Sequence, residues 1–394
     1  MRKRILSAAL CQIMVIFVFF LSNFSGNRLY AEQAQTGEQF VFELEYSPNG
    51  FHTLIDVYIL PLNKTFAQEP DLKGKIVRGH ILAGSQEKVY IPFIWDINLS
   101  RLYVDINRNN DLTDDGANSI FTSRSEPGYG FFNNIQMKFQ ADSVEIPFVI
   151  SVTLYDFNLS YSSSYIQSGF IGEIELHGKK WQLAIADNLN GIINSDDYLY
   201  LLPAEMNLDR GSQQQSFSAA QTIFIDGHNY TASYEIINKN DKPVLQVTLT
   251  ESDYSKGEVN IRGKSIRLLT LETDSVLVQL DSPVGAIAVP IGNYSVSDVF
   301  LDGGKFGIFR AEEFPLESSK ITVAEDQSCD LTIGAPLNNT ARISRMGNVI
   351  TLDYELLGIG KEKYEKITQT LTEAPTLSVF KGDRKIASGK FEFG

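Results

Sequence analysis

Short apolar stretches that alternate with polar residues recur along the chain, and this alternation narrows the possible folds more than any other feature. In residues 40–46, "FVFELEY", a large apolar side chain falls at every second position, which is the period of a half-buried β-strand. Similar stretches, rich in β-branched and aromatic residues, cover 146–157, 275–280, 286–296 and 348–358.

Turn signals separate these stretches. Asp226-Gly227 lies between two alternating runs, which is the strongest short-range signal for a hairpin, and Gly178 and Gly382 occupy similar positions. Only residues 361–371, "KEKYEKITQTL", indicate a short helix, of two or three turns. The sequence therefore predicts an all-β protein of two or three β-sandwich, immunoglobulin-like or transthyretin-like domains in tandem.

Two polar stretches suggest how the chain is divided. Residues 208–221 are polar and rich in small side chains, and residues 309–320 form a second candidate seam. We therefore expect a β-domain at 36–210, a middle β-domain at 211–312 and a C-terminal domain at 313–394. The last has the size of an immunoglobulin-like sandwich, although the cysteine pair of antibody-type domains is missing.

The N-terminal segment predicts export. "MRKR" precedes an apolar run from Ile5 to Leu21, and the small residue Ala31 follows a polar stretch. This order is typical of a signal peptide, here residues 1–31, and predicts a secreted, periplasmic or cell-surface protein. The apolar run is close to the length needed to cross a bilayer, so an uncleaved N-terminal anchor is the alternative. No later segment is apolar enough to span a membrane.

Charge limits the partners of the mature chain. Removing residues 1–31 takes away four of the 34 basic residues and none of the 48 acidic residues, which leaves a formal charge of −18. Nucleic acids and anionic membranes attract basic surfaces, so neither is expected as a partner. Cys329 is then the single cysteine, and an intramolecular disulfide is impossible, so stability must come from burial or from a metal.

The most pointed motif is "DINRNNDLTDD", residues 105–115. Calcium prefers six to eight oxygen ligands, which EF-hand loops place at alternate positions. Asp105, Asn107 and Asn109 occupy positions 1, 3 and 5, and Asp111 occupies position 7, where the backbone carbonyl is the usual ligand. Position 12 is not acidic, so Asp115, or its neighbour Asp114, would have to complete the ligand set.

This loop predicts a calcium site that stabilises the fold. Asn110 stands where glycine is usual, and asparagine tolerates the left-handed backbone needed there. "RLYV" before the loop predicts a strand where an EF-hand has a helix. The alternative is a surface turn, because Asn and Asp are common turn residues. A plain turn, however, does not need four acidic residues that repel one another.

A weaker copy of the motif lies about 82 residues further on. A strand-like stretch leads into Asp187, and an Asn-rich loop ends at Asp196-Asp197. Position 3 is Leu189, whose side chain cannot bind a metal. A second calcium site at 187–197 is therefore not expected, and the sequence favours a turn.

No recognised catalytic motif is present. The four histidines form no H-x-x-x-H or H-E-x-x-H pattern, and no G-x-S-x-G, P-loop or dinucleotide-binding turn occurs. We therefore favour a binding or structural module without catalysis, with an extracellular protein or polysaccharide as partner. The alternative is a carbohydrate-active protein, either a lectin-like binder with exposed tyrosines or a hydrolase with two carboxylates. Trp95 and Trp181 lie in apolar stretches and are expected in the core.

The stretches "RLYVDINRNNDLTDDG", "AIADNLNGIINSDD", "SPVGAIAVPIGNYSVSDVFL" and "RKIASGKFEFG" together resemble a group of exported bacterial multi-domain β-rich proteins of unassigned function. Such proteins combine "VD-N-NGDLTDD" loops with a C-terminal "GKFEYG" ending. The chain departs from this pattern at Asn110 and in the second loop. The resemblance implies export, β-domains and calcium, and it implies no substrate. "VPIGNYSV" (289–296) is also similar to transthyretin-like or peptidase-regulatory β-domains.

Overall fold

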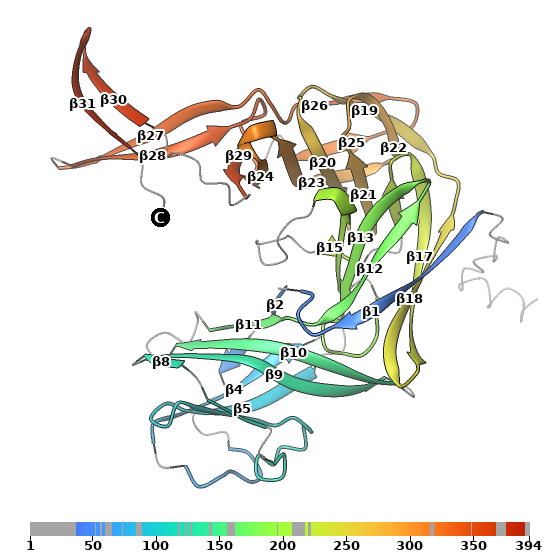
Figure 1. Cartoon of the computed structure of the whole chain (residues 1–394), viewed down its shortest axis with the longest axis vertical. Coiled ribbons are helices and arrows are strands. Elements are labelled where there is room, and N and C mark those ends of the chain that lie inside the picture. Colours follow the sequence, from blue (N-terminus) through green and yellow to red (C-terminus); the bar gives the residue numbers. More distant parts are fainter. Residues whose placement is uncertain are drawn as a thin grey trace, which may run out of the picture. The chain divides into compact units, whose positions relative to one another are not determined.

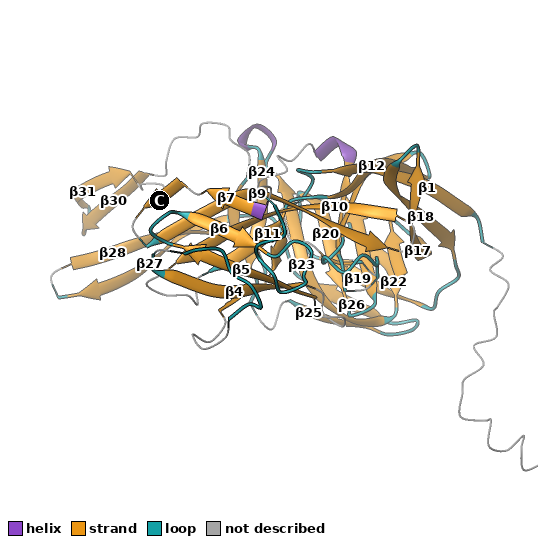
Figure 2. Cartoon of the chain, turned by 90° about the horizontal axis from the view of Figure 1, so that it is seen from below, coloured by secondary structure: helices purple, strands orange, loops and turns teal. Residues whose placement is uncertain are grey.

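Strands dominate the computed structural model of the protein, and helical segments are short (Figures 1 and 2). The structure describes residues 37–51, 53–55, 57–59, 65–72, 74–83, 89–116, 119–122, 124–126, 128–141, 144–155, 162–194, 196–206, 217–219, 222–315, 319–347, 349–367 and 376–390. The predicted signal peptide at 1–31 lies outside these ranges. In the part of the chain described, no helix has the length and apolar character needed to cross a membrane. The prediction of an all-β fold is confirmed.

The largest sheet contains 16 strands and joins distant parts of the sequence. In order across the sheet, its strands are β15 (Phe217–Ser218), β14 (Tyr198–Pro203), β13 (Lys179–Ala186), β12 (Gly169–Leu176), β1 (Gln39–Ser47), β18 (Lys242–Glu251), β17 (His228–Lys239), β16 (Thr222–Ile225), β21 (Val276–Asp281), β20 (Ile266–Glu272), β23 (Gly292–Asp302), β24 (Ile308–Glu313), β29 (Lys363–Lys366), β28 (Val349–Leu357) and β27 (Asn338–Met346), while β25 (Lys320–Val323) pairs with β23 off this path.

Four smaller sheets complete the described strands. One sheet is β2 (Thr53–Ile55), β11 (Ser163–Ile166), β10 (Val144–Tyr155), β9 (Tyr129–Ala141) and β8 (Arg124–Glu126); another is β3 (Val57–Ile59), β4 (Ile76–Ala83), β5 (Val89–Asp96), β6 (Arg101–Val104) and β7 (Ile120–Thr122). The third is β22 (Gly285–Pro290), β19 (Lys256–Ile261) and β26 (Ser328–Leu331), and the last is the hairpin β30 (Thr376–Lys381) and β31 (Arg384–Lys390). The 3-10 helices η3 (Ala204–Met206) and η4 (Gly304–Phe306) are one turn each.

Most strands expected from the alternating pattern form. β1 covers the expected stretch 40–46, and β10, β21 and β28 cover most of the expected stretches 146–157, 275–280 and 348–358. The stretch 286–296 instead forms two strands, β22 and β23, which belong to different sheets. The chain passes from one sheet to the other at Ile291, whose backbone N–H donates to Ser255 O at 3.0 Å.

The expected helix at 361–371 is wrong where the structure describes it. Residues 363–366 form strand β29, which pairs antiparallel with β24. Tyr364 is 3% exposed, while Glu365 on the opposite face is exposed. This period-two burial is that of a strand, and pairing with β24 overrides the helix propensity of the Lys and Glu residues.

The predicted hairpin turns form with the expected backbone. Asp226 has φ 46° and Gly227 has φ 99°, between β16 and β17. His177 and Gly178 have φ 48° and 77° between β12 and β13, and Gly382 has φ 60° between β30 and β31. In the first two turns both central residues have positive φ, and in the third Gly382 does. Positive φ at these positions matches the right-handed twist of the flanking strands, which explains why these turns can be predicted from the sequence.

Two large apolar clusters fill the interior. The first contains Leu44, Trp95, Phe132 and Trp181, and the second contains Leu269, Tyr294 and Tyr364 among others. Backbone contacts place residues 38–394 in one unit, and β1 pairs with β18 across the expected boundary at 210–211. The division into three domains stays a prediction.

Candidate metal-binding loops

The first residue of the loop 105–115, Asp105, is held by strand β6 and covered by the rest of the loop. Asp105 follows β6 directly and donates its backbone N–H to Pro92 O at 2.9 Å. This bond continues the pairing of β6 with β5, where Phe93 lies opposite Val104. Asp105 is consequently 0% exposed. A carboxylate held at such a site must be satisfied by the loop that covers it.

The loop folds back over the Asp105 carboxylate. Asn109 N–H donates to its Oδ1 at 3.2 Å, and Asn110 N–H donates to its Oδ2 at 2.8 Å. Arg108 and Asn110 adopt left-handed backbone, with φ 61° and 68°. The expectation that Asn110 occupies a left-handed position is therefore confirmed.

The two asparagines at positions 3 and 5 shape the middle of the loop. Asn107 Oδ1 accepts the N–H of Asn109 at 3.0 Å, and Asn109 Oδ1 accepts the N–H of Asp111 at 2.7 Å. Each bond spans two residues, as in an Asx-turn. An amide oxygen has two lone pairs, so each of these oxygens keeps one acceptor site for a further ligand.

Asp115 closes the loop. Its Oδ1 accepts the N–H of Asn107 at 3.0 Å, and its Oδ2 is buried with no hydrogen-bond partner. Asp114 instead accepts the side-chain amides of Asn107 at 3.0 Å and Asn109 at 2.7 Å. The carboxylate of Asp111 turns toward Thr113, whose N–H donates to it at 2.8 Å. The loop thus groups Asp105, Asn107, Asn109 and Asp115, and directs the side chain of Asp111 elsewhere.

Uncompensated negative charge accumulates in this loop. Burial raises the pKa of Asp105, and the nearby Asp114 carboxylate adds to the rise against opposing backbone hydrogen bonds. Burial also raises the pKa of Asp115, with further contributions from Asp105 and Asp114. Among the described residues no Lys or Arg forms an ion pair with these carboxylates. The guanidinium carbon of Arg108 lies over the Phe139 ring, 4.3 Å from its centre.

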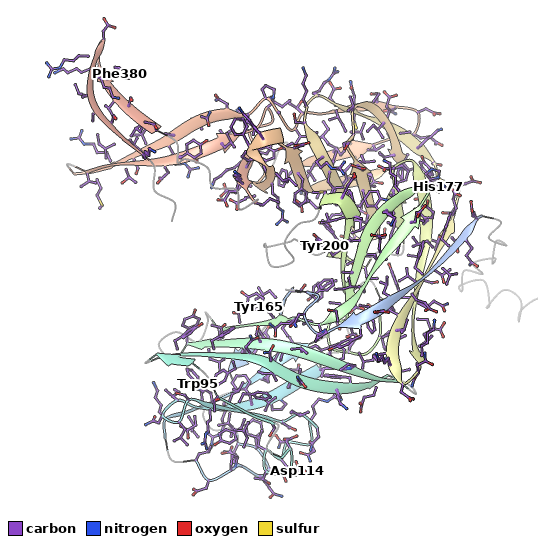
Figure 3. All side chains as sticks on the ribbon, viewed as in Figure 1. Trp95, Asp114, Tyr165, His177, Tyr200 and Phe380 are labelled. Carbon is purple, nitrogen blue, oxygen red and sulfur yellow. The ribbon has the colours of Figure 1, made fainter. Side chains whose placement is uncertain are left out.

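The rest of the loop is anchored to the segment 65–72, which lies between β3 and β4, and packs on the sheet β3–β7. Ala67 N–H donates to Asn110 O at 2.9 Å, and Leu112 N–H donates to Gln68 O at 3.1 Å. Leu112 packs in a small apolar cluster with Phe66, Ile94 and Tyr103. The side chain of Asp114 lies in the loop region beyond the strands in Figure 3. A cation bound here would fasten the loop to the sheet.

The second acidic loop, 187–197, joins β13 to β14. Asp187 is 2% exposed, and its Oδ1 accepts the N–H groups of Asn190 at 2.8 Å and Gly191 at 3.2 Å. Asp197 is 1% exposed and accepts the N–H of Asn188 at 2.8 Å. Leu189 is 0% exposed and packs in the first apolar cluster, so its side chain is no ligand, as expected.

A histidine cluster was not anticipated from the sequence. His177, His228 and Glu251 are the one group of the described chain in which three His, Cys, Asp or Glu ligand atoms lie within 4.8 Å of one another. Neither acidic loop contains such a group among its described residues, so at most two of its carboxylates lie this close together. Amide or backbone oxygens would have to complete a calcium site there. The three residues come from a turn and two strands far apart in sequence, so no spacing signal reveals them.

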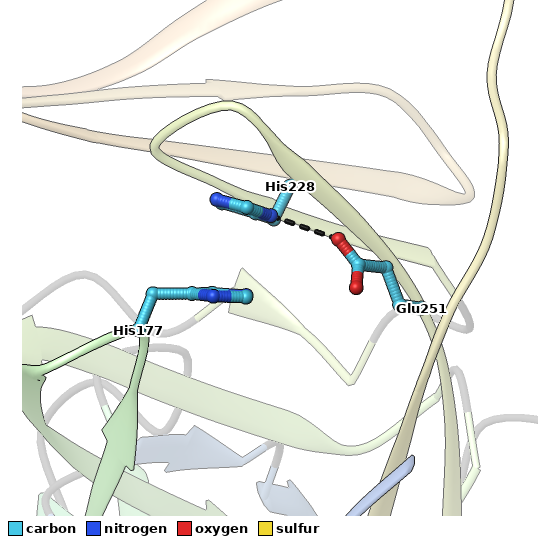
Figure 4. A group of neighbouring side chains, drawn as sticks. All are labelled: His177, His228 and Glu251. Carbon is cyan, nitrogen blue, oxygen red and sulfur yellow. Dashed lines mark hydrogen bonds and ion pairs between the residues drawn. The ribbon is translucent and has the colours of Figure 1, made fainter. Parts of the chain in front are cut away.

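The geometry of this cluster disfavours a shared metal. The rings of His177 and His228 stack with centres 3.6 Å apart and planes 14° apart, and His228 Nδ1 lies 2.8 Å from Glu251 Oε1 (Figure 4). The lone pair of an imidazole nitrogen lies in the plane of its ring. Two nearly parallel rings cannot both aim such lone pairs at one ion without turning.

The aromatic side chains that could contact a sugar fall into a buried group and an exposed group. Trp95 and Trp181 are each 1% exposed, which confirms their expected place in the core. Tyr58 and Tyr90 are 46% and 51% exposed and flank His80, with ring centres 5.5 Å and 4.9 Å from the imidazole. The three residues lie on neighbouring strands β3, β4 and β5, where they form an aromatic row.

A carboxylate pair occurs at Glu312 and Glu365. Burial raises the pKa of Glu312 to about 7, and a hydrogen bond with the Glu365 side chain adds to this rise. Carboxyl groups in direct hydrogen-bond contact lie closer than the roughly 5–10 Å that separates the two acids of glycosidases. This pair therefore lacks the spacing expected of a glycoside hydrolase.

Comparisons with known proteins add no relative. The chain matches no protein-family model, no curated protein and no solved structure.

Proposed function

We propose that the chain is an exported protein, secreted, periplasmic or on the cell surface, that acts as a calcium-stabilised binding or structural module without catalysis. Its partner would be an extracellular protein or a polysaccharide. Calcium at Asp105, Asn107, Asn109, Asp115 and the backbone of Asp111 would act on stability and take no part in a reaction.

One observation carries the calcium proposal. The loop 105–115 folds around the buried carboxylate of Asp105 and leaves the buried Oδ2 of Asp115 without a hydrogen-bond partner. A polar turn would leave such groups in water, because an unpaired buried polar atom costs about 1–3 kcal/mol. A divalent cation with oxygen ligands satisfies the atom and offsets the charge.

The proposal is tested by thermal unfolding of the purified protein in EGTA and in millimolar calcium. Calcium at about 100 times its Kd stabilises the native state by about 2.7 kcal/mol, so the midpoint should rise by several degrees. Asp105→Ala should remove most of this rise. The exposed turn residue Asp274 forms no hydrogen bond or ion pair with any described residue, and Asp274→Ala should keep the full rise. A midpoint that ignores calcium in the native protein contradicts the proposal.

Carbohydrate binding is the second candidate, and the aromatic row of Tyr58, His80 and Tyr90 favours it. Aromatic faces stack on sugar rings, and the two tyrosines of this row are exposed on a sheet. The double variant Tyr58→Ala/Tyr90→Ala should lose co-sedimentation with an insoluble polysaccharide that retains the native protein. Phe306→Ala, at a residue that is 53% exposed elsewhere, should bind as the native protein does. If the native protein is retained by none of the common polysaccharides, this candidate falls.

A further inference from the structure

We propose that the loop 187–197 is a second calcium site, built on the plan of the loop 105–115 and with its own ligands. The sequence favours a turn here because Leu189 stands at the third position. The hydrogen bonds and the burial of the loop lead to the opposite conclusion. The proposal does not require that the first loop binds calcium.

The two loops share their internal hydrogen bonds. In each, the first aspartate accepts two consecutive backbone N–H groups, from Asn109 and Asn110 in one loop and from Asn190 and Gly191 in the other. In each, an asparagine then accepts the N–H two residues on, at 2.7 Å from Asp111 and 2.8 Å from Ile192.

The closing contacts also correspond. Asn107 N–H donates to Asp115 Oδ1 at 3.0 Å, and Asn188 N–H donates to Asp197 Oδ1 at 2.8 Å. Among the described residues, left-handed backbone occurs twice in each loop, at Leu189 (φ 72°) and Gly191 (φ 83°) in the second. The central asparagine is Asn109 in the first loop and Asn190 in the second. The second loop has one residue fewer before this asparagine and one more after it, so the hydrogen bonds of the two loops correspond although their position numbers do not. Asn188 thus takes the place of Asn107, and Leu189 that of Arg108.

Unpaired buried oxygens point to a ligand in the second loop. Asp187 Oδ2 and Asn188 Oδ1 have no hydrogen-bond partner, on residues that are 2% and 3% exposed. Asp196 Oδ2 is also buried and unpartnered. All three atoms are acceptors, so they cannot satisfy one another. Only a donor or a cation can do so.

The Asp187 carboxylate is held toward the interior of the loop. Its Oδ1 is fixed by Asn190 and Gly191 of the loop itself, which holds the unpartnered Oδ2 of the same carboxylate against the loop. The amide nitrogen of Asn188 donates to Asp196 O at 3.2 Å, which leaves its oxygen on the other side of the amide free for an ion. The far end of the loop is fixed where Ala219 N–H donates to Asp197 O at 2.8 Å.

The charges of this loop also lack a counter-ion. Among the described residues, no basic side chain forms an ion pair with Asp187, Asp196 or Asp197. Carboxylate and amide oxygens without nitrogen or sulfur ligands are the set that calcium prefers.

The test counts calcium ions by titration calorimetry on EGTA-stripped protein. The native protein should bind two equivalents, and Asp187→Asn should bind one fewer than the native protein. Asn188→Leu keeps the backbone bond to Asp197 but removes the unpaired oxygen, and should weaken one site at least tenfold. Asp241→Asn, in the exposed turn between β17 and β18, should bind as the native protein does. If Asp187→Asn fails to fold, Asn188→Leu decides.

The result for this loop is separable from the result for the first. A native protein that binds one ion, lost in Asp187→Asn or weakened in Asn188→Leu but kept in Asp105→Asn, supports the second site and contradicts the first. A native protein that binds one ion, lost only in Asp105→Asn, contradicts the second site. So does a native protein that binds no calcium, or a count and affinity that neither variant in the second loop changes.

Discussion

Asn110 carries the strongest backbone constraint in the loop 105–115. Its φ is 68°, its N–H donates to Asp105 and its C=O accepts from Ala67. Left-handed backbone costs most residues roughly 1–2 kcal/mol, and more for a β-branched side chain. Asn110→Val should therefore lower the unfolding free energy by about 2 kcal/mol in urea with EGTA. Asn110→Gly should change it by less than about 1 kcal/mol, and equal losses in both variants would contradict this explanation.

The burial of Asp298 should make the free energy of unfolding depend on pH. It is 3% exposed and pairs with Arg310 Nε at 2.9 Å, and burial raises its pKa from 3.8 to about 6 despite Arg310. The folded state binds the proton of the Asp298 carboxyl more tightly than the unfolded state does. Protonated Asp298 therefore stabilises the fold below pH 4, and this contribution is lost as the pH rises through 6. At about 1.4 kcal/mol per pH unit this loss is roughly 3 kcal/mol.

The measurement compares the native protein with Asp298→Asn by urea unfolding between pH 4 and pH 7. The native protein should lose stability relative to the variant as the pH rises across this range, because the variant cannot ionise. Asp274→Asn serves as the control and should show no such trend. A stability difference that is flat, or that grows in favour of the native protein with pH, would contradict the raised pKa.

At the residue scale, the sequence predicted what depends on local spacing. Asp105, Asn107, Asn109 and Asp115 come together because they belong to one loop. The unpaired oxygen of Asn188 was missed, because its burial comes from strands that flank the loop and from the core. The stacking of the His177 and His228 rings was not predicted, because it depends on how the sheet brings the turn between β12 and β13 to the start of β17 across β1 and β18.

At the scale of elements, Gly227 tests how far a hairpin depends on its turn. It has φ 99°, and a side-chain carbon added there would meet nothing within 4 Å. Gly227→Ala should therefore cost roughly 1–2 kcal/mol through backbone conformation alone. Gly389, in strand β31, also has open space around it and no positive φ, so Gly389→Ala should be close to neutral. Equal effects in thermal unfolding would rule out backbone strain as the cause.

The elements predicted well are those whose signals are local. Alternation and Asp-Gly or His-Gly turns depend only on neighbours in the chain, so β1, β16 and β17 could be located. The strand at Lys363–Lys366 could not be predicted, because its Lys and Glu residues favour a helix. Only the pairing with β24, which is distant in sequence, makes this segment a strand. Likewise, the break at Ile291 depends on the partners of β22 and β23, which lie in different sheets.

At the scale of the whole molecule, the two apolar clusters predict where calcium acts. Both acidic loops extend from strands of the first cluster: Val104 precedes the first loop, and Leu189 belongs to the second. Strands β20 and β23 place most of their buried side chains in the second cluster and only Leu268 and Phe300 in the first. A bound ion slows hydrogen exchange only in those strands whose opening destroys the ion's site, because the ion binds the closed form alone.

Hydrogen exchange with and without calcium tests this expectation. Calcium should slow exchange in β5, β6, β13 and β14, and leave β20 and β23 almost unchanged. Asp105→Asn should remove the protection of β5 and β6 and keep that of β13 and β14, because each loop anchors its own pair of strands. Equal slowing in all six strands would mean that the two clusters open as one cooperative unit. In that case calcium would stabilise the molecule as a whole, and the continuous ladder from β18 through β16 and β21 to β20 would be the structure that couples the clusters.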